Sequence, residues 1–216
     1  MSTRNRFDEQ LEILNSHIID MGTLIERTIS FAAMALITQE EEYVQKTIAI
    51  EEEIDHQEKQ IESLCMKLLL RQQPVASDLR LISSALKMIT DMERIGDQAR
   101  DIAEITTFLN GKQIEQIKHI PQMAEATIKM VTESVNAFVM RDLELALSVA
   151  KSDDIIDKLF LKVRDELIEL IKIDSENGAS AIDLLMIAKY FERIGDHAAN
   201  IAEWVVYAVT GKHKNG

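Results

Sequence analysis

Turn-forming residues are scarce in this chain. Seven glycines and two prolines occur among 216 residues, whereas soluble proteins on average use about 12% of these two types together. All-β and α/β proteins need Gly and Pro at many of their turns. The sequence therefore predicts few, long elements, and those elements are helices.

The sequence also shows no signal for a disulfide, a signal peptide or a membrane span. The single cysteine, Cys65, has no partner for an intrachain disulfide and is typical of a small buried side chain. Acidic residues follow the N-terminal arginines directly, where a signal peptide needs an apolar stretch. The longest nearly apolar run, residues 29–37, is about half as long as a membrane span. We expect a cytoplasmic protein.

Positive charge is in deficit. The chain has 37 acidic and 24 basic side chains, which gives a formal charge of −13. This charge disfavours nucleic acid and anionic membrane surfaces as partners, so we expect membrane contact only through other proteins. Hydrophobic residues make up 46% of the chain, enough for a packed core.

The strongest positive feature is an internal repeat. The segment DMERIGDQARDIAE at residues 91–104 recurs as YFERIGDHAANIAE at residues 190–203, with nine of fourteen positions identical at an offset of 99. The pattern predicts an all-α protein built from two tandem three-helix bundles related by pseudo-symmetry. The two repeats span residues 1–111 and 119–211. Helices are expected at residues 6–37, 39–72, 77–109, 121–140, 142–175 and 179–209.

Local signals place the helix ends. Thr38 followed three residues later by Glu41 matches a capping box, which predicts the start of the second helix. Pro121 is expected to open the fourth helix. The charged pair Arg141 and Asp142 predicts a bend between the fourth and fifth helices.

Acidic side chains recur four residues apart on two helices of each repeat. On a helix, Glu93 and Asp97 fall on the face opposite Ile95 and Ala99, which are expected in the core. The acid-x-x-x-Asp pattern occurs four times, as Glu51 with Asp55, Glu93 with Asp97, Asp153 with Asp157, and Glu192 with Asp196. Three further acids extend these stripes: Asp101, Glu104 and Glu203.

Two interpretations of the stripes are open. They are solvated faces if Arg94 and Arg193 neutralise the acids three residues on. Like charges at i,i+4, however, destabilise a helix by about 0.2–0.5 kcal/mol per pair. Facing carboxylate pairs bind hard cations and iron, so the stripes predict metal sites, with iron, zinc, manganese or magnesium as the candidate ions. Gly96 and Gly195, between the paired acids, predict close helix packing.

The sequence contains no nucleophilic constellation. Its five histidines are dispersed, and none is paired with a serine or cysteine in a catalytic pattern. Glu53 and His56 match the Glu-x-x-His motif of ferritin-like di-iron bundles, but no second copy exists. We therefore predict a protein that is not an enzyme. A ferritin-like di-metal carboxylate enzyme and a metal-independent helical adaptor are the alternatives.

Three features together resemble the PhoU family of bacterial phosphate-signalling and phosphate-transport accessory proteins. They are the segment RQQPVASDLR at residues 71–80, the two copies of ERIGD, and the paired acid-x-x-x-Asp helices. The resemblance covers essentially the whole chain. It implies two three-helix bundles, cytosolic residence, a homodimer, and multinuclear metal clusters held by the eight acids of the acid-x-x-x-Asp pairs, with Asp101, Glu104 and Glu203 as weaker candidates.

The resemblance also implies a role in phosphate homeostasis. PhoU-like proteins restrain the phosphate-starvation response and modulate phosphate uptake. They link the ATPase subunit of a phosphate ABC transporter to a phosphate sensor histidine kinase. The second repeat departs from the first. It has Asn200 for Asp101 and Ala199 for Arg100, and it has Phe160 and Arg164 at the spacing of Glu58 and Glu62. We therefore expect fewer metal ions in the second repeat.

Overall fold

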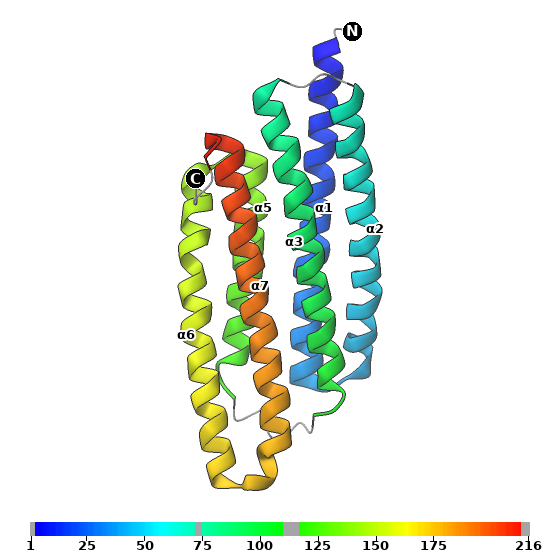
Figure 1. Cartoon of the computed structure of the whole chain (residues 1–216). Coiled ribbons are helices and arrows are strands. Elements are labelled where there is room, and N and C mark those ends of the chain that lie inside the picture. The colour runs from blue at the N-terminus through cyan, green and yellow to red at the C-terminus, as the bar shows by residue number, and fades with distance from the viewer. Residues whose placement is uncertain (1–2, 72–74, 110–116, 213–216) are drawn as a thin grey trace.

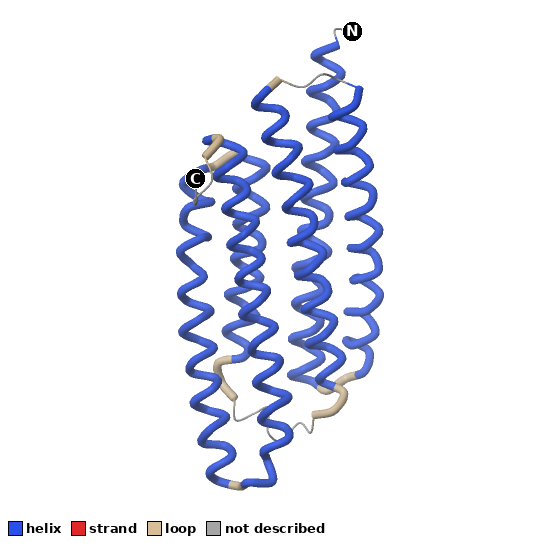
Figure 2. Tube along the Cα trace, in the orientation of Figure 1, coloured by secondary structure: helices blue, strands red, loops and turns tan. Residues whose placement is uncertain are grey.

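The computed structural model describes residues 3–71, 75–109 and 117–212 and is almost entirely helical in this part of the chain (Figures 1 and 2). No strand occurs among these residues, which confirms the all-α prediction. The helices are α1 (Thr3–Thr38), α2 (Glu41–Arg71), α3 (Ala76–Thr106), α5 (Ile120–Met140), α6 (Leu143–Ile173) and α7 (Gly178–Thr210), with a 3-10 turn, η1 (Ser175–Asn177), before α7.

The helices form two three-helix groups that lie side by side. Helices α1, α2 and α3 pack on one another, as do α5, α6 and α7. The most extensive single helix–helix contact joins α3 to α7 and therefore joins the two repeats, and α1 also packs on α5. The predicted division at residues 111 and 119 falls between the end of α3 and the start of α5, and residues 110–116 lie outside the described part.

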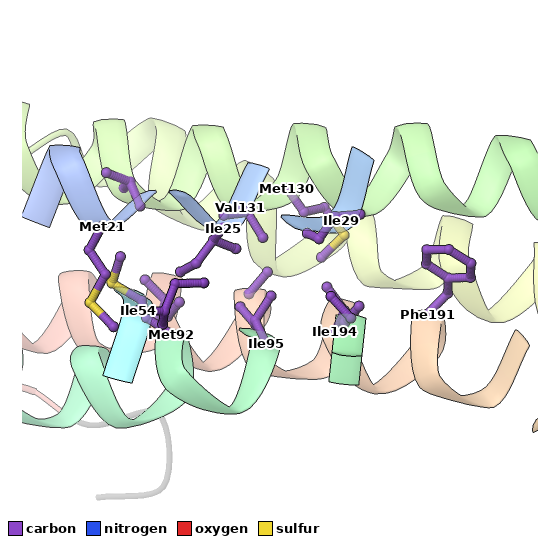
Figure 3. Packing of buried hydrophobic residues seen from close by; sticks show 14 of the residues in the cluster. Met21, Ile25, Ile29, Ile54, Met92, Ile95, Met130, Val131, Phe191 and Ile194 are labelled. Carbon is purple, nitrogen blue, oxygen red and sulfur yellow. The ribbon is translucent and has the colours of Figure 1, made fainter. Parts of the chain in front are cut away.

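One hydrophobic core runs through both groups. Figure 3 shows Ile25 of α1, Ile95 of α3, Val131 of α5 and Ile194 of α7 within the same cluster. All four side chains are fully buried. Their spacing follows the predicted apolar faces, so each amphipathic helix turns its apolar stripe to the shared interior. The predicted burial of Cys65 is confirmed, since its exposed fraction is zero.

Most predicted helix ends lie one to three residues from the observed ones, and one predicted capping signal is wrong. Thr38 is the last residue of α1 rather than the cap of α2, because its hydroxyl donates to the carbonyl of Met34 (2.9 Å). Gln39 then reverses the chain with a φ of 59°. The bend at Arg141 and Asp142 is confirmed: Arg141 ends α5 with a φ of 54°, and the Asp142 carboxylate accepts from the N–H of Leu145 (3.0 Å).

The apolar composition of α1 bears on the expected absence of a membrane span. By length and composition alone, the stretch Phe7–Thr38 would suffice to cross a membrane, which we did not predict. This is weak evidence, because core helices of soluble proteins satisfy the same criterion. In this protein α1 packs against α2, α3 and α5, and that packing accounts for its apolar residues.

Candidate functional site

The acids of the first repeat converge where α2 faces α3. We call Glu51, Asp55, Glu58, Glu93 and Asp97 the first acidic cluster. The two helices approach closely because Gly96 has no side chain: a Cβ there would lie 3.2 Å from Cδ1 of Ile54. Burial raises the pKa of Glu93, and the negative charges of Asp97, Glu58 and Asp55 raise it further. The predicted carboxylates of these two helices therefore share one electrostatic environment.

Arginines neutralise part of the first acidic cluster. Glu51 is only 7% exposed, and its Oε2 accepts from Nη1 of Arg100 at 2.9 Å. Burial raises the pKa of Glu51, and Arg100 works in the opposite direction. Nη1 of Arg94 donates to Oδ2 of Asp97, also at 2.9 Å. A cation that binds here has to displace these two guanidinium groups from their carboxylates.

The acids of the second repeat converge in the same way where α6 faces α7. We call Asp153, Asp157, Glu192 and Asp196 the second acidic cluster. A Cβ at Gly195 would lie 3.3 Å from Oδ1 of Asp153, so this glycine makes room for the carboxylate. Burial, then the charges of Asp196 and Asp157, raises the pKa of Asp153 to about 6.

Neutralisation is weaker in the second cluster. Glu192 forms an ion pair with Lys189, but the position equivalent to Arg100 is Ala199. Asp153, which corresponds to Glu51, therefore lacks the arginine that pairs with Glu51 in the first repeat. The second cluster has one carboxylate fewer, since Phe160 replaces Glu58, but it also has fewer cations competing for its carboxylates.

The three weaker candidates have other surroundings. Asp101 accepts a hydrogen bond from the Tyr190 hydroxyl of α7, which counteracts the burial that raises the pKa of Asp101. Glu104 accepts from Nε of Arg100 at 2.9 Å and is exposed. Glu203 lines an apolar cavity beside Leu147 between α6 and α7.

Sequence reasoning missed a polar contact that joins the repeats. Nδ1 of His197 donates to Oδ1 of Asp91 at 2.8 Å, and Nδ2 of Asn200 reaches the same oxygen at 3.4 Å. With the offset of 99, Asp91 corresponds to Tyr190 and Asn200 to Asp101. The bond from Tyr190 to Asp101 is therefore the pseudo-symmetric counterpart of the contact between Asp91 and Asn200. Asparagine is favourable at position 200, because an aspartate there would repel the Asp91 carboxylate.

The carboxylates of both clusters are chemically suited to hard cations, but their side chains are not arranged around a common ion position. In the described ranges 3–71, 75–109 and 117–212, no three Asp, Glu, His or Cys side chains are positioned to hold one ion as they stand. Carboxylate oxygens are nevertheless the preferred ligands of such ions, and both clusters bring them to facing helices. Ion binding would require side-chain rotation in either cluster and the release of arginines in the first.

The di-iron motif of the alternative interpretation is not directed into the bundle. Glu53 and His56 are both exposed on α2. Nδ1 of His56 donates to the carbonyl of Glu52 at 2.8 Å. A ferritin-like centre needs such motifs to project between facing helices, so the structure disfavours that alternative.

Comparisons with known proteins cover almost the whole chain. The PhoU domain matches residues 18–106 and again 120–205. A phosphate-specific transport system accessory protein PhoU homolog of Clostridium acetobutylicum is 37% identical over 212 residues, which is 97% of each chain. The crystal structure of PhoU from Pseudomonas aeruginosa superposes with a TM-score of 0.87 at 35% identity and covers 95% of this chain and 100% of that one. The phosphate transport system regulatory protein PhoU from Streptococcus pneumoniae gives a TM-score of 0.87 at 30% identity over 95% of this chain and 98% of that one.

Proposed function

The chain belongs to the PhoU family, and from this membership we propose that it is a regulatory accessory protein of a phosphate-specific transport system. The observation that carries the proposal is the match over nearly the full length of both chains, in sequence and in fold. Both repeats are matched, so each of the two bundles has a counterpart in the family.

The finer role is to restrain the phosphate-starvation response. The protein binds the ATPase subunit of the phosphate ABC transporter and the sensor histidine kinase at the inner face of the membrane, and it acts as a cytoplasmic homodimer without chemistry of its own. The net charge of −13 supports attachment through these proteins rather than through anionic lipid. Exposed apolar side chains on α6, such as Leu147 and Leu161, provide surface for protein contacts.

Deletion of the coding sequence tests this role. Phosphate-responsive genes are expected to become active in phosphate-rich medium, and affinity capture of the protein from cells with intact uptake is expected to recover the transporter ATPase and the kinase. Correct repression in the deletion strain would contradict the regulatory role. Because no catalytic residue is proposed, the control is complementation of the deletion strain with the wild-type chain.

Metal binding at the two acidic clusters is the second part of the proposal. The eight acids of the four acid-x-x-x-Asp pairs would hold iron, zinc, manganese or magnesium. The bound ions would supply positive charge that offsets the repulsion between neighbouring carboxylates. The raised pKa values of Glu93 and Asp153 support this, because burial and then neighbouring like charges disfavour the ionised form of each side chain. Cations that bind only the folded state would also stabilise it.

Elemental analysis of protein purified without chelator tests the metal proposal. We expect the double replacements Glu93→Ala with Asp97→Ala, and Glu192→Ala with Asp196→Ala, each to lower the metal content. The exposed acids Glu9 and Glu12 of α1 provide the matched control, since their replacement removes the same charge away from the clusters. Equal metal content in all four proteins would contradict metal binding by the clusters and would favour their interpretation as solvated faces.

A further inference from the structure

A small cavity separate from both acidic clusters lies where α3 begins and where α5 and α7 end. Its volume is about 150 Å³. Two guanidinium groups line it, those of Arg80 on α3 and Arg141 at the end of α5, together with Ser77 in the first turn of α3. The remaining wall is apolar and includes Phe138 and Val205, and no carboxylate contributes to it.

Both arginines lack partners within the described part of the chain. Neither Arg80 nor Arg141 makes a side-chain hydrogen bond or ion pair there. Nε of Arg80 is buried and has no hydrogen-bond partner. A buried N–H without an acceptor costs free energy, and rotation of the Arg80 side chain toward a bound anion would supply the missing acceptor.

The first turn of α3 adds donors to the same cavity. Val75, the residue at the N-cap, makes no side-chain capping bond to the helix. Ser77 has a hydroxyl that is exposed and makes no hydrogen bond in the described part of the chain. The first N–H groups of a helix and its positive dipole end favour an anion. Arg80, Arg141 and Ser77 are thus three lining side chains that carry donors, and no acidic residue lines the cavity.

The pseudo-symmetric corner of the protein makes the same chain reversal without arginines. With the offset of 99, Arg80 corresponds to Ala179 on α7. Arg141, which ends α5 with a φ of 54°, corresponds to Gln39, which follows α1 with a φ of 59°. The same chain reversal is therefore made without a guanidinium group, and the arginine pair is specific to one of the two corners.

We propose that this cavity binds a small tetrahedral oxyanion of the phosphate class. Two guanidinium groups present paired N–H donors that match phosphate oxygens, and the volume suits a small ion rather than a nucleotide. The ligand chemistry is shared by free inorganic phosphate and by a phosphoryl group on a small organic molecule. This inference does not rest on the regulatory role proposed above, since it concerns binding to the isolated protein.

A structural role for Arg80 is the competing explanation. A Cβ at Gly211 would lie 3.5 Å from both Cδ and Nε of Arg80, so this side chain lies against the C-terminal end of α7. A cation at that end interacts favourably with the helix dipole. If this were its only role, replacement of Arg80 would lower the melting temperature and leave anion binding unchanged.

Titration of the full chain by calorimetry and by phosphorus NMR separates these explanations. Inorganic phosphate and phenyl phosphate are titrated separately against wild type, Arg80→Gln, Arg141→Gln and Arg164→Gln, with sodium chloride holding the ionic strength constant. Arg164 is the matched control, because it is exposed, pairs with its neighbour Asp165 at 2.8 Å and lies on α6 outside the cavity.

We expect saturable one-site binding of at least one ligand to wild type and to Arg164→Gln, and binding at least tenfold weaker in the two cavity variants. The ligand that binds identifies the source of the oxyanion. If Arg80→Gln fails to fold, Arg141→Gln decides the outcome, since that side chain is exposed at a helix end. No saturation with either ligand, or equal binding by all four proteins, would overturn the proposal.

Discussion

Replacement of Arg100 is expected to lower the free energy of unfolding, because it leaves the buried carboxylate of Glu51 without its ion-pair partner. Nη1 of Arg100 lies 2.9 Å from Oε2 of Glu51, whose side chain is 9% exposed. Breaking a fully buried ion pair by removing one partner costs about 3–5 kcal/mol. The Arg100 side chain is 38% exposed, so water screens the pair, and we expect Arg100→Gln to lower the free energy of unfolding by about 2 kcal/mol at pH 8.

The effect should depend on pH in a defined direction. Burial already raises the pKa of Glu51, and Arg100 is the strongest opposing influence, so the variant raises this pKa further. An acid whose pKa is higher in the folded than in the unfolded state destabilises the fold when it ionises. The deficit of Arg100→Gln relative to wild type is therefore largest above the raised pKa and shrinks as the pH falls through it.

A double-mutant cycle measured by urea unfolding in chelator isolates this interaction. Glu51→Gln removes the buried charge, so Arg100→Gln should cost much less in that background, with a coupling energy of at least about 1 kcal/mol. Arg164→Gln controls for the loss of an exposed arginine and should change stability by less than about 0.5 kcal/mol. The same loss with and without Glu51, or a loss that does not vary with pH, would refute the reasoning.

Three further predictions concern the second repeat and its contact with the first. Asp153→Asn should stabilise the metal-free protein by about 1 kcal/mol above pH 6, after discounting for solvent exposure. This gain should vanish near pH 4, because the pKa of Asp153 is raised to about 6. Urea unfolding across pH tests it, with Asp154→Asn at the exposed neighbouring position as the control. Gly195→Ala should lose the helix-propensity gain of about 1 kcal/mol, since its Cβ would lie 3.2 Å from Cγ1 of Ile156, whereas Gly178→Ala, with no atom within 4 Å, should be stabilising in thermal melts. Tyr190→Phe should cost about 1 kcal/mol by removing the donor to Asp101, and unchanged stability would contradict a contribution from that inter-repeat bond.

The asymmetry between the repeats has a physical explanation that revises one sequence-based argument. Asn200 was expected to reflect a poorer metal site, but it faces Asp91 of α3 at 3.4 Å and belongs to the contact between repeats. Ala199 removes the counterpart of Arg100, which leaves Asp153 without an arginine. Only Phe160, in place of Glu58, withdraws a carboxylate from the cluster. The expectation of fewer ions in the second repeat stays a prediction and now rests on Phe160 and Arg164, which stand where the first repeat has Glu58 and Glu62.

The sequence by itself determined the helices, their order and the acidic faces. Scarce Gly and Pro left few places for the chain to turn, and apolar residues three and four apart defined one buried face for each helix. The repeat at offset 99 predicted the two bundles, and the acids opposite Ile95 and Ile194 were assigned to the correct faces. These features are local or periodic, so they can be read along one chain segment at a time.

Only the tertiary structure decided which charges meet. Arg100 is 49 residues from Glu51 in sequence and Asp91 is 106 from His197, and neither pairing follows from helical periodicity. The cavity of Arg80 and Arg141 likewise exists only because the start of α3 and the ends of α5 and α7 meet at one corner. Helix packing sets these distances, and an ion pair depends on distance and burial rather than on sequence spacing.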